Sequence, residues 1–200
     1  MPRARCKGHR RALSALPTEL DYRPLNLIYL GTNRLHRNRA NLIQTLHTVA
    51  AFHGLGLSVR LDVPPWRGRL DARLEALGIG VPLDVRAARL LHSRWRRFGY
   101  WPFVQWHKLR LKAADARYTR TPELSLALVH AGLSHHLEIH DTRDLLRYGM
   151  LAPIVAAHRV GLIDWLLPIS RAAASVLVDA GASAERMHVC PSGVDIDAYV

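Results

Sequence analysis

The stretch ADARYTRTPELSLALVHAG, residues 114–132, is the part of the sequence that decides the fold. Its beginning, Ala116 to Thr119, is typical of a short strand. Thr121-Pro122-Glu123 then provides an N-cap, a first-turn proline and a first-turn acid, in the order that begins a helix. Apolar residues follow at helical spacing until Gly132, which ends the helix. The stretch therefore predicts a strand that is followed directly by a helix.

The same order of strand and helix recurs along the rest of the chain. Trp165 to Ile169 predicts a strand, Ser170 caps the next helix, and Gly181 ends it. After the first strand, Asn38 is expected to cap a helix that ends at Gly54. The remaining predicted strands are Leu25–Leu30, Leu57–Leu61, Val81–Val85, Leu137–Ile139 and Met187–Cys190. About seven strands that alternate with helices predict an α/β fold, with an open, parallel, Rossmann-like sheet covered by helices on both faces.

The composition of the 200-residue chain restricts the kind of protein that it forms. Hydrophobic residues make up 49% and charged residues 22%, which favours a globular domain over a disordered segment. The formal net charge of +12 favours anionic partners. Two cysteines exclude a disulfide framework and a four-cysteine zinc site, and they favour a reducing compartment. No apolar stretch reaches the roughly 18 residues of a membrane helix, so we expect a cytoplasmic protein, at most peripheral at the inner face of the membrane.

Ligands of open parallel sheets bind beyond the carboxyl ends of the strands, so we expect the functional residues there. The candidates that follow the predicted strands directly are Thr32, Asn33, Arg34, Arg120, His140, Asp141 and Ser170. The loop after the first strand is neither a Gly-x-Gly-x-x-Gly motif nor a P-loop, which disfavours dinucleotide and ATP binding. Arg120 has a planar guanidinium that suits a phosphate or carboxylate, although a solvated loop arginine explains it equally well. Ser170 is most simply a helix cap.

His136, Glu138 and His140 alternate along one predicted strand, so their side chains share one face. Two histidines at this spacing can chelate zinc, but the sequence identifies no third ligand, and we predict no metal. In a second interpretation only His140, at the end of the strand, faces the crevice, where a neutral imidazole accepts a hydroxyl proton or orients a sugar hydroxyl. In a third, His140 is a structural histidine with a hydrogen bond at the strand terminus.

Residues 86–112 stand out because they contain eight basic residues and no acidic residue. Three of the five tryptophans also lie there. This mixture suits docking on anionic lipid headgroups, and it suits single-stranded nucleic acid less well. A crossover helix that packs its aromatic residues on the sheet explains it too. The candidate docking residues are Arg94, Trp95, Arg96, Arg97, Trp101 and Trp106.

Four blocks of sequence, taken in order, are similar to motifs of one enzyme family. They are LIYLG (27–31) with RANLIQT (39–45), ADARYTR (114–120), LEIHD (137–141), and LPIS (167–170) with VCPSGVD (189–195). Together they resemble the N-terminal, acceptor-side half of retaining GT-B glycosyltransferases of the family 4 kind. By this resemblance residues 25–193 form the Rossmann-like acceptor domain, residues 1–24 are a flexible basic tail, and residues 194–200 begin the interdomain linker.

The resemblance implies a function for the residues at the strand ends. His140 matches a histidine that family members place against the reacting sugar, with Glu138 and Asp141 beside it. The glycine pair that many members have after the first strand is absent here. The resemblance implies a nucleotide-sugar as co-substrate, bound without a metal or cofactor. In the family a C-terminal donor-binding domain, which this sequence lacks, holds most of the nucleotide-sugar. A separate C-terminal half is therefore an expected partner. The alternative is a non-catalytic module that docks on an anionic membrane or a partner protein; nucleic acid is the least favoured partner.

Overall fold

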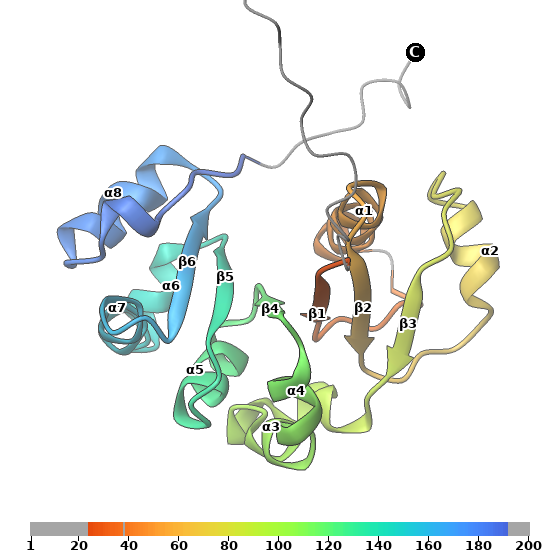
Figure 1. The fold of residues 1–200 in the computed structure, drawn as a ribbon, viewed down its shortest axis with the longest axis horizontal. Coiled ribbons are helices and arrows are strands. Elements are labelled where there is room, and N and C mark those ends of the chain that lie inside the picture. Colours follow the sequence, from red (N-terminus) through yellow and green to blue (C-terminus); the bar gives the residue numbers. More distant parts are fainter. Residues whose placement is uncertain (1–23, 38, 192–200) are drawn as a thin grey trace, which may run out of the picture.

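The computed structural model describes residues 24–37 and 39–191 as an α/β fold built on one parallel sheet (Figure 1). The sheet has six strands in the order β3-β2-β1-β4-β5-β6. The strands are β1 (Asn26–Leu30), β2 (Ser58–Val63), β3 (Asp84–Ala87), β4 (Ala116–Thr119), β5 (His135–Ile139) and β6 (Ile163–Pro168). The chain starts at the centre and reverses direction across the sheet between β1 and β4, as in Rossmann-like folds. The predicted α/β class with a parallel sheet is confirmed.

Two of the predicted strands are wrong in detail, and prolines explain both. Residues Met187–Cys190 follow the edge of β6 but form only an isolated bridge to Leu166 and single backbone hydrogen bonds, so the described sheet has six strands and not seven. Pro168 at the end of β6 has no N–H to donate back, which prevents a continuous ladder. The strand predicted at Val81–Val85 starts later, at the Asp84 of β3, because Pro82 cannot donate to the sheet either.

Strand β1 forms the centre of the sheet because its residues are apolar on both faces. Leu27, Ile28, Tyr29 and Leu30 are at most 3% exposed. Leu27 and Tyr29 belong to the core on one face, and Ile28 and Leu30 to the core on the other. A strand without alternating polarity is expected in a parallel sheet that helices cover on both sides.

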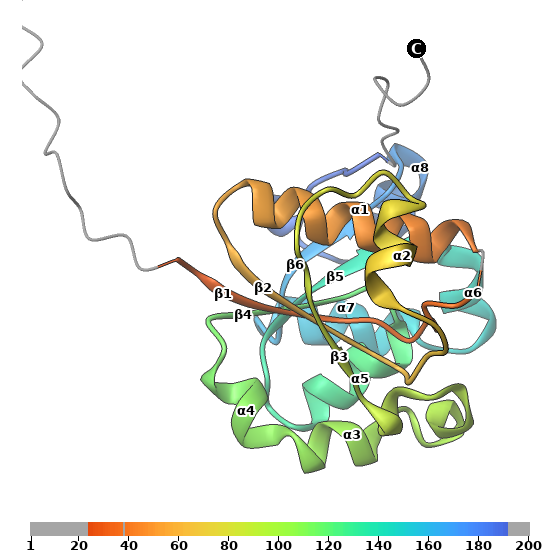
Figure 2. The same cartoon turned by 90° about the vertical axis from the view of Figure 1, so that its right-hand side faces the viewer.

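The helices divide between the two faces, as Figure 2 shows with α1 and α2 above the sheet and α3, α4 and α5 below it. The upper helices are α1 (Ala40–Gly54) and α2 (Leu70–Glu75). The lower ones are α3 (Trp101–Trp106), α4 (Lys108–Ala113), α5 (Pro122–His130) and α7 (Leu151–Arg159). Helices α6 (Thr142–Arg147) and α8 (Arg171–Asp179) contact each other beside β6. Three short 3-10 turns, η1 (Arg89–Leu91), η2 (Ser93–Phe98) and η3 (Ala184–Arg186), complete the described elements.

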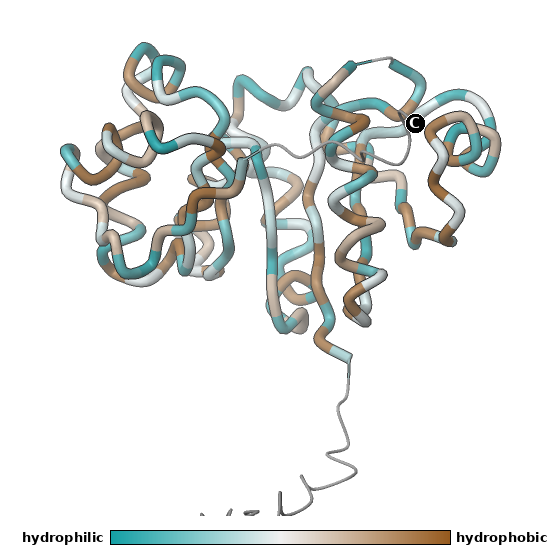
Figure 3. Tube along the Cα trace, turned by 90° about the horizontal axis from the view of Figure 1, so that it is seen from above, coloured by the Kyte–Doolittle hydropathy of each residue, from teal (hydrophilic) through white to brown (hydrophobic). Residues whose placement is uncertain are grey.

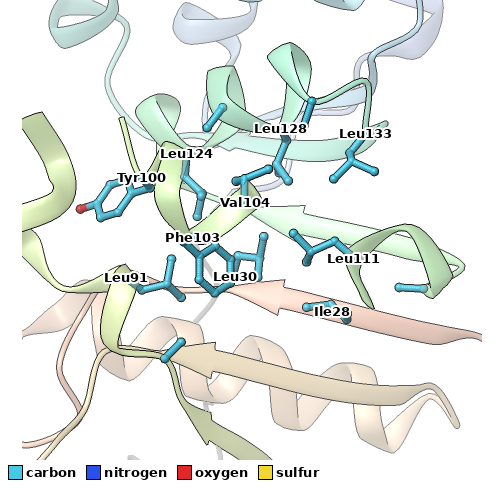
Figure 4. Packing of buried hydrophobic residues seen from close by; sticks show 14 residues of the cluster. Ile28, Leu30, Leu91, Tyr100, Phe103, Val104, Leu111, Leu124, Leu128 and Leu133 are labelled. Carbon is cyan, nitrogen blue, oxygen red and sulfur yellow. The ribbon is translucent and has the colours of Figure 1, made fainter. Parts of the chain in front are cut away.

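The segment 86–112 joins β3 to β4, and its apolar side chains pack on the lower face of the sheet. Phe103 and Val104 of α3 are fully buried against Leu30 of β1 and Leu124 of α5 (Figure 4). The interpretation of this segment as crossover packing therefore holds for its inner side.

The helix starts and ends that the sequence predicted are largely confirmed. Thr121 is the N-cap position of α5, and the Ser170 hydroxyl accepts a hydrogen bond from the Ala173 N–H at 3.1 Å at the start of α8. Gly132 and Gly181 follow these helices with φ of 70° and 94°, the left-handed conformation that ends a helix. Helix α1 has Arg39 as its N-cap. The predicted cap Asn38, the linker 194–200 and all but the last residue of the predicted tail 1–24 lie outside the described residues.

The carboxyl ends of the strands open toward polar loops. Along the upper edge of Figure 3, where these loops lie, much of the trace has the colour of hydrophilic residues. Between residues 24 and 191, apart from residue 38, no helix combines the length and the hydropathy that crossing a bilayer requires. The polar edge at the strand ends is the region in which the predicted site residues meet.

Candidate functional site

A cleft of about 370 Å³ opens at the carboxyl ends of β1 and β4. Four predicted site residues line it: Thr32, Asn33 and Arg34 after β1, and Arg120 after β4. The Thr32 hydroxyl lies 3.1 Å from the hydroxyl of Thr121, so the two loops are joined across the cleft. The cleft lies where the order of the strands reverses, which is the usual ligand position in such sheets.

His140 lies at the carboxyl end of β5, next to the cleft, and two charged side chains hold its ring. Nη2 of Arg120 is 3.0 Å from Nδ1 and 2.5 Å from Nε2 of His140, and a Glu138 carboxylate oxygen contacts Nε2. Because a carboxylate only accepts and a guanidinium only donates, the neutral tautomer with its proton on Nε2 gives each partner one ring nitrogen. Nε2 then donates to Glu138, and the Nδ1 lone pair accepts from Arg120. Arg120 thus connects the predicted catalytic histidine to the cleft.

Helix α1 fixes the position of Arg120. Nη1 of Arg120 donates to the Asn41 carbonyl oxygen at 2.9 Å and to the Thr45 hydroxyl at 3.3 Å, and Nη2 donates to Oε1 of Gln44 at 3.2 Å. The Arg120 side chain is only 8% exposed. Sequence reasoning did not identify these three supports as site residues. Their spacing, which places them on one face of a helix, was the signal available for finding them.

Glu138 is a buried carboxylate that its neighbours keep ionised. Tyr118 donates its hydroxyl hydrogen to Oε2 of Glu138 at 2.8 Å. Burial acts to raise the pKa of Glu138, but the hydrogen bond from His140, the charge of Arg120 and the Tyr118 hydrogen bond outweigh it and hold that pKa below its usual range. Burial and the charge of Glu138 raise the pKa of Tyr118, so its phenol remains a donor. Glu138 therefore fixes the His140 ring from the protein interior and does not line the cleft.

Asp141 and Ser170, which we also predicted at this edge, cap helices. Asp141 Oδ1 accepts a hydrogen bond from the Arg143 N–H at 2.8 Å at the start of α6, and its carboxylate pairs with the Arg143 guanidinium at 3.0 Å. Ser170 caps α8. Neither residue lines the cleft, and neither makes a hydrogen bond or an ion pair with Arg120 or His140.

The three alternating residues His136, Glu138 and His140, of which the last follows β5 directly, have different surroundings. Whereas Glu138 and His140 contact each other, His136 lines an apolar groove with Tyr118 and Trp165. Burial lowers the pKa of His136, which favours its neutral form. In the part of the chain that the structure describes, no group of three histidine, cysteine, aspartate or glutamate side chains is placed to hold a metal ion.

The candidate docking residues divide between the surface and the interior. Trp101 is 43% and Trp106 is 80% exposed, whereas Trp95 packs partly buried against the core. Arg94 lies over the ring of Trp95, with 5.5 Å between the guanidinium carbon and the ring centroid. Arg97 stacks in the same way on Phe98 at 4.7 Å. The segment thus exposes two of its three indoles, whereas the indole that Arg94 contacts is the partly buried one.

Arg96 lines the cleft and is also exposed at the surface. Its Nε donates to Oε1 of Glu123 at 2.7 Å, and both residues line the cleft. The backbone turns just after Arg96, where Gly99 and Tyr100 both adopt positive φ, 56° and 58°. Tyr100 is the single non-glycine residue with positive φ in residues 24–37 and 39–191, and it also lines the cleft. A strained conformation of this kind is typical of functional regions, and sequence reasoning missed it.

Comparison with known proteins relates the fold to solved structures. No protein-family model matches the chain, and no curated protein matches it in sequence. A crystal structure of Anabaena Alr3699/HepE in complex with UDP and glucose matches with a TM-score of 0.57 and 17% identity, over 88% of this chain and 46% of that chain. A second structure of the same protein, in complex with UDP-glucose, matches with a TM-score of 0.56 and 17% identity, over 86% and 45%.

At this level of identity the likeness concerns the fold. The chain spans less than half the length of each HepE structure that it matches. The shared part is the parallel α/β sheet, so the Rossmann-like arrangement derived from the sequence has a counterpart among solved proteins.

Proposed function

We propose that this chain is the acceptor-side domain of a retaining GT-B glycosyltransferase of the family 4 kind. The observation that supports this most is the position of His140, which Glu138 and Arg120 hold at the carboxyl edge of the sheet, beside the cleft. The fold likeness to a protein crystallised with UDP-glucose adds support, because a nucleotide-sugar is the co-substrate that the proposal requires.

The proposed role of His140 follows from its contacts. Glu138 fixes the ring by accepting a hydrogen bond from Nε2–H, and Nδ1 keeps a lone pair that Arg120 faces in the free domain. A sugar hydroxyl that enters beside Arg120 would donate to Nδ1 in its place, so that His140 orients the reacting sugar. The Arg120 guanidinium would then be available to an oxygen of the same ligand. Positioning of this kind lowers the barrier because it removes the entropy cost of orientation before the reaction.

The proposal divides the reaction between two domains. This chain would bind the acceptor and contribute His140, while a C-terminal donor-binding half would hold most of the nucleotide-sugar. The length of the match, less than half of each HepE chain, is consistent with this division. Alone, the chain is then expected to turn over slowly or not at all.

The experiment that tests the proposal is an assay of nucleoside diphosphate release from a panel of nucleotide-sugars that begins with UDP-glucose. The chain is assayed alone, together with a C-terminal half expressed in trans, and with each part omitted. Release that needs both parts, with a product of the same anomeric configuration as the donor, is the expected result. Release by the C-terminal half alone at the full rate would overturn the assignment, and an inverted product would overturn the retaining mechanism.

A second function, docking on an anionic membrane, is favoured by exposed apolar residues of α3 and α4. Trp106 is 80% and Leu109 is 86% exposed, and the basic residues Lys108 and Lys112 accompany them. Interfacial aromatic and basic side chains in one short segment are the combination that anionic headgroups bind. Such docking would place the enzyme at the inner face of the membrane, close to a lipid-linked acceptor.

Sedimentation with vesicles tests this second function. The protein is expected to bind anionic vesicles but not zwitterionic ones, and the double variant Trp106→Ser/Leu109→Ser should lose the binding. Leu55→Ser is the matched control, because Leu55 is 77% exposed at the end of α1. Equal loss in the control, or competition by a single-stranded oligonucleotide at equal strength, would reduce the binding to general attraction of polyanions.

A further inference from the structure

Basic side chains clearly outnumber acidic ones in the lining of the cleft beside His140. Five arginines line it, against two acidic residues. The arginines are Arg34, Arg37, Arg39, Arg96 and Arg120, and the acids are Glu123 and Asp144. A cleft that only had to hold neutral sugar hydroxyls would not need this excess.

Two of these arginines already have partners. Arg96 pairs with Glu123 at 2.7 Å, and Arg120 is held by α1 and His140. The side chains of the other three, Arg34, Arg37 and Arg39, make no ion pair and no hydrogen bond with the rest of the described chain. They come from one short loop between β1 and α1, so their charges lie at one side of the cleft.

The surroundings of this arginine loop also favour a negative ligand. Helices α1 and α5 both begin at the cleft, with Arg39 and Asn41 lining it from the start of α1 and Pro122 from the start of α5. The N-terminal ends of helices have partial positive charge and free N–H groups, which bind anions. Burial, followed by the charges of Arg34, Arg94 and Arg37, lowers the pKa of the neighbouring His92, so the positive field of the loop reaches beyond the cleft.

We infer that the acceptor of this domain has an oxyanion group, a phosphate or a carboxylate, that Arg34 and Arg37 bind with help from Arg39. This inference rests on the proposed function, in which the cleft is the acceptor side of the active site. The planar guanidinium groups would hold the oxyanion at the β1 loop, while the sugar ring of the acceptor reaches toward Arg120 and His140. A cleft of about 370 Å³ has the volume for one sugar with such a group.

Binding titration on the full chain tests the inference without any need for turnover. The probes are glucose 6-phosphate, glucuronate, glucose and UDP, measured by calorimetry. We expect glucose 6-phosphate or glucuronate to bind at least about tenfold more tightly than glucose, because an arginine–oxyanion contact is a strong, charge-assisted hydrogen bond. Which of the two binds better identifies the anionic group.

A double variant in the cleft and a single variant at the opposite edge of the sheet separate binding in the cleft from the general basicity of the protein. Arg34→Gln/Arg37→Gln should weaken binding of the anionic sugar by about 10- to 100-fold, and Arg159→Gln should leave it unchanged. Arg159 is exposed at the end of α7, which precedes β6 and therefore lies at the opposite edge of the sheet. All three substituted arginines lack side-chain partners in the described residues, so these variants should fold normally.

Several results would overturn the inference. They are equal weakening by Arg159→Gln, equal affinity for glucose and its anionic derivatives, and binding of UDP alone that the double variant abolishes. The last result would make the cleft a site for the donor diphosphate. Because the titration does not depend on transfer, nucleoside diphosphate release that needs both halves would still support the proposed function if the inference fails.

Discussion

The two ends of β5 place a histidine in opposite surroundings. His135, at the start of the strand, is fully buried, with Nε2 at 2.7 Å from the Ser125 hydroxyl and Nδ1 at 3.2 Å from the Leu133 carbonyl oxygen. His140, just after its end, is 27% exposed and contacts the charged groups of Glu138 and Arg120. One histidine has neutral, internal partners, and the other has charged partners at the edge of a cleft.

The same residue type thus supports the structure at one end of the strand and, in the proposed function, orients the sugar at the other. Burial lowers the pKa of His135 to about 4, so its imidazole is neutral at physiological pH and holds α5 against β5 through Ser125. His140 lies where the sheet opens to solvent, and its ring is oriented by a carboxylate that Tyr118 supports from the core. A histidine that only filled space would not need that second layer of support.

The largest expected effect concerns the structural histidine. His135→Ala should lower the free energy of unfolding by about 3 kcal/mol, because it leaves a cavity and removes the partner of the buried Ser125 hydroxyl. Urea denaturation at neutral pH measures this change. His53→Ala, at an exposed position at the end of α1, is the control and should stay within about 0.5 kcal/mol of the wild type. If His135→Ala changed the free energy of unfolding no more than His53→Ala does, His135 would have no structural role.

The burial of His135 should also make the stability of the protein depend on pH. The pKa of His135 is lower in the folded protein than its unfolded value of 6.5, so the unfolded state binds more protons and stability falls as pH drops below 6.5. By about pH 5 this loss amounts to about 2 kcal/mol. The measurement is the unfolding free energy of the wild type and of His135→Gln at several pH values. In His135→Gln the unfolding free energy should fall less steeply as the pH drops. If it falls equally steeply in both proteins, His135 is not the buried neutral histidine that we describe.

The smallest expected effect concerns the support of His140. Tyr118→Phe removes the hydroxyl that donates to Glu138, which should raise the pKa of Glu138, cost about 1 kcal/mol of stability and lower activity a few-fold. Tyr148→Phe, at an exposed position, is the matched control. Activity of the Tyr118 variant at several pH values measures the change. An unchanged profile would show that Glu138 orients His140 without support from the Tyr118 hydroxyl.

The sequence was sufficient for the fold because helix signals are local. Thr121-Pro122-Glu123 and Ser170 lie at helix starts wherever the rest of the chain is placed, and Gly132 and Gly181 end those helices for reasons of backbone conformation alone. The prediction of a seventh strand at Met187–Cys190 was wrong because pairing at a sheet edge also depends on the neighbouring strand. Pro168 at the end of β6 has no N–H that could donate to this segment.

The site was harder to predict because its contacts join distant parts of the chain. The residues of α1 that hold Arg120 are separated from it by more than 70 positions, so their spacing on one helix face does not reveal that Arg120 is their partner. Arg96, one of the predicted docking residues, also lines the cleft through its pair with Glu123, which is 27 positions away. His135 and His136 differ in role only because alternate residues of a strand face opposite sides.

The turnover of His140→Ala tests the central claim, that the open end of β5 is functional and its buried end structural. Nucleoside diphosphate release is measured for the complemented enzyme under conditions in which urea denaturation shows the variant to be fully folded. We predict a loss of about 100-fold or more in turnover, with an unfolding midpoint close to that of the wild type. Unchanged turnover, or a midpoint that falls as far as that of His135→Ala, would contradict the account.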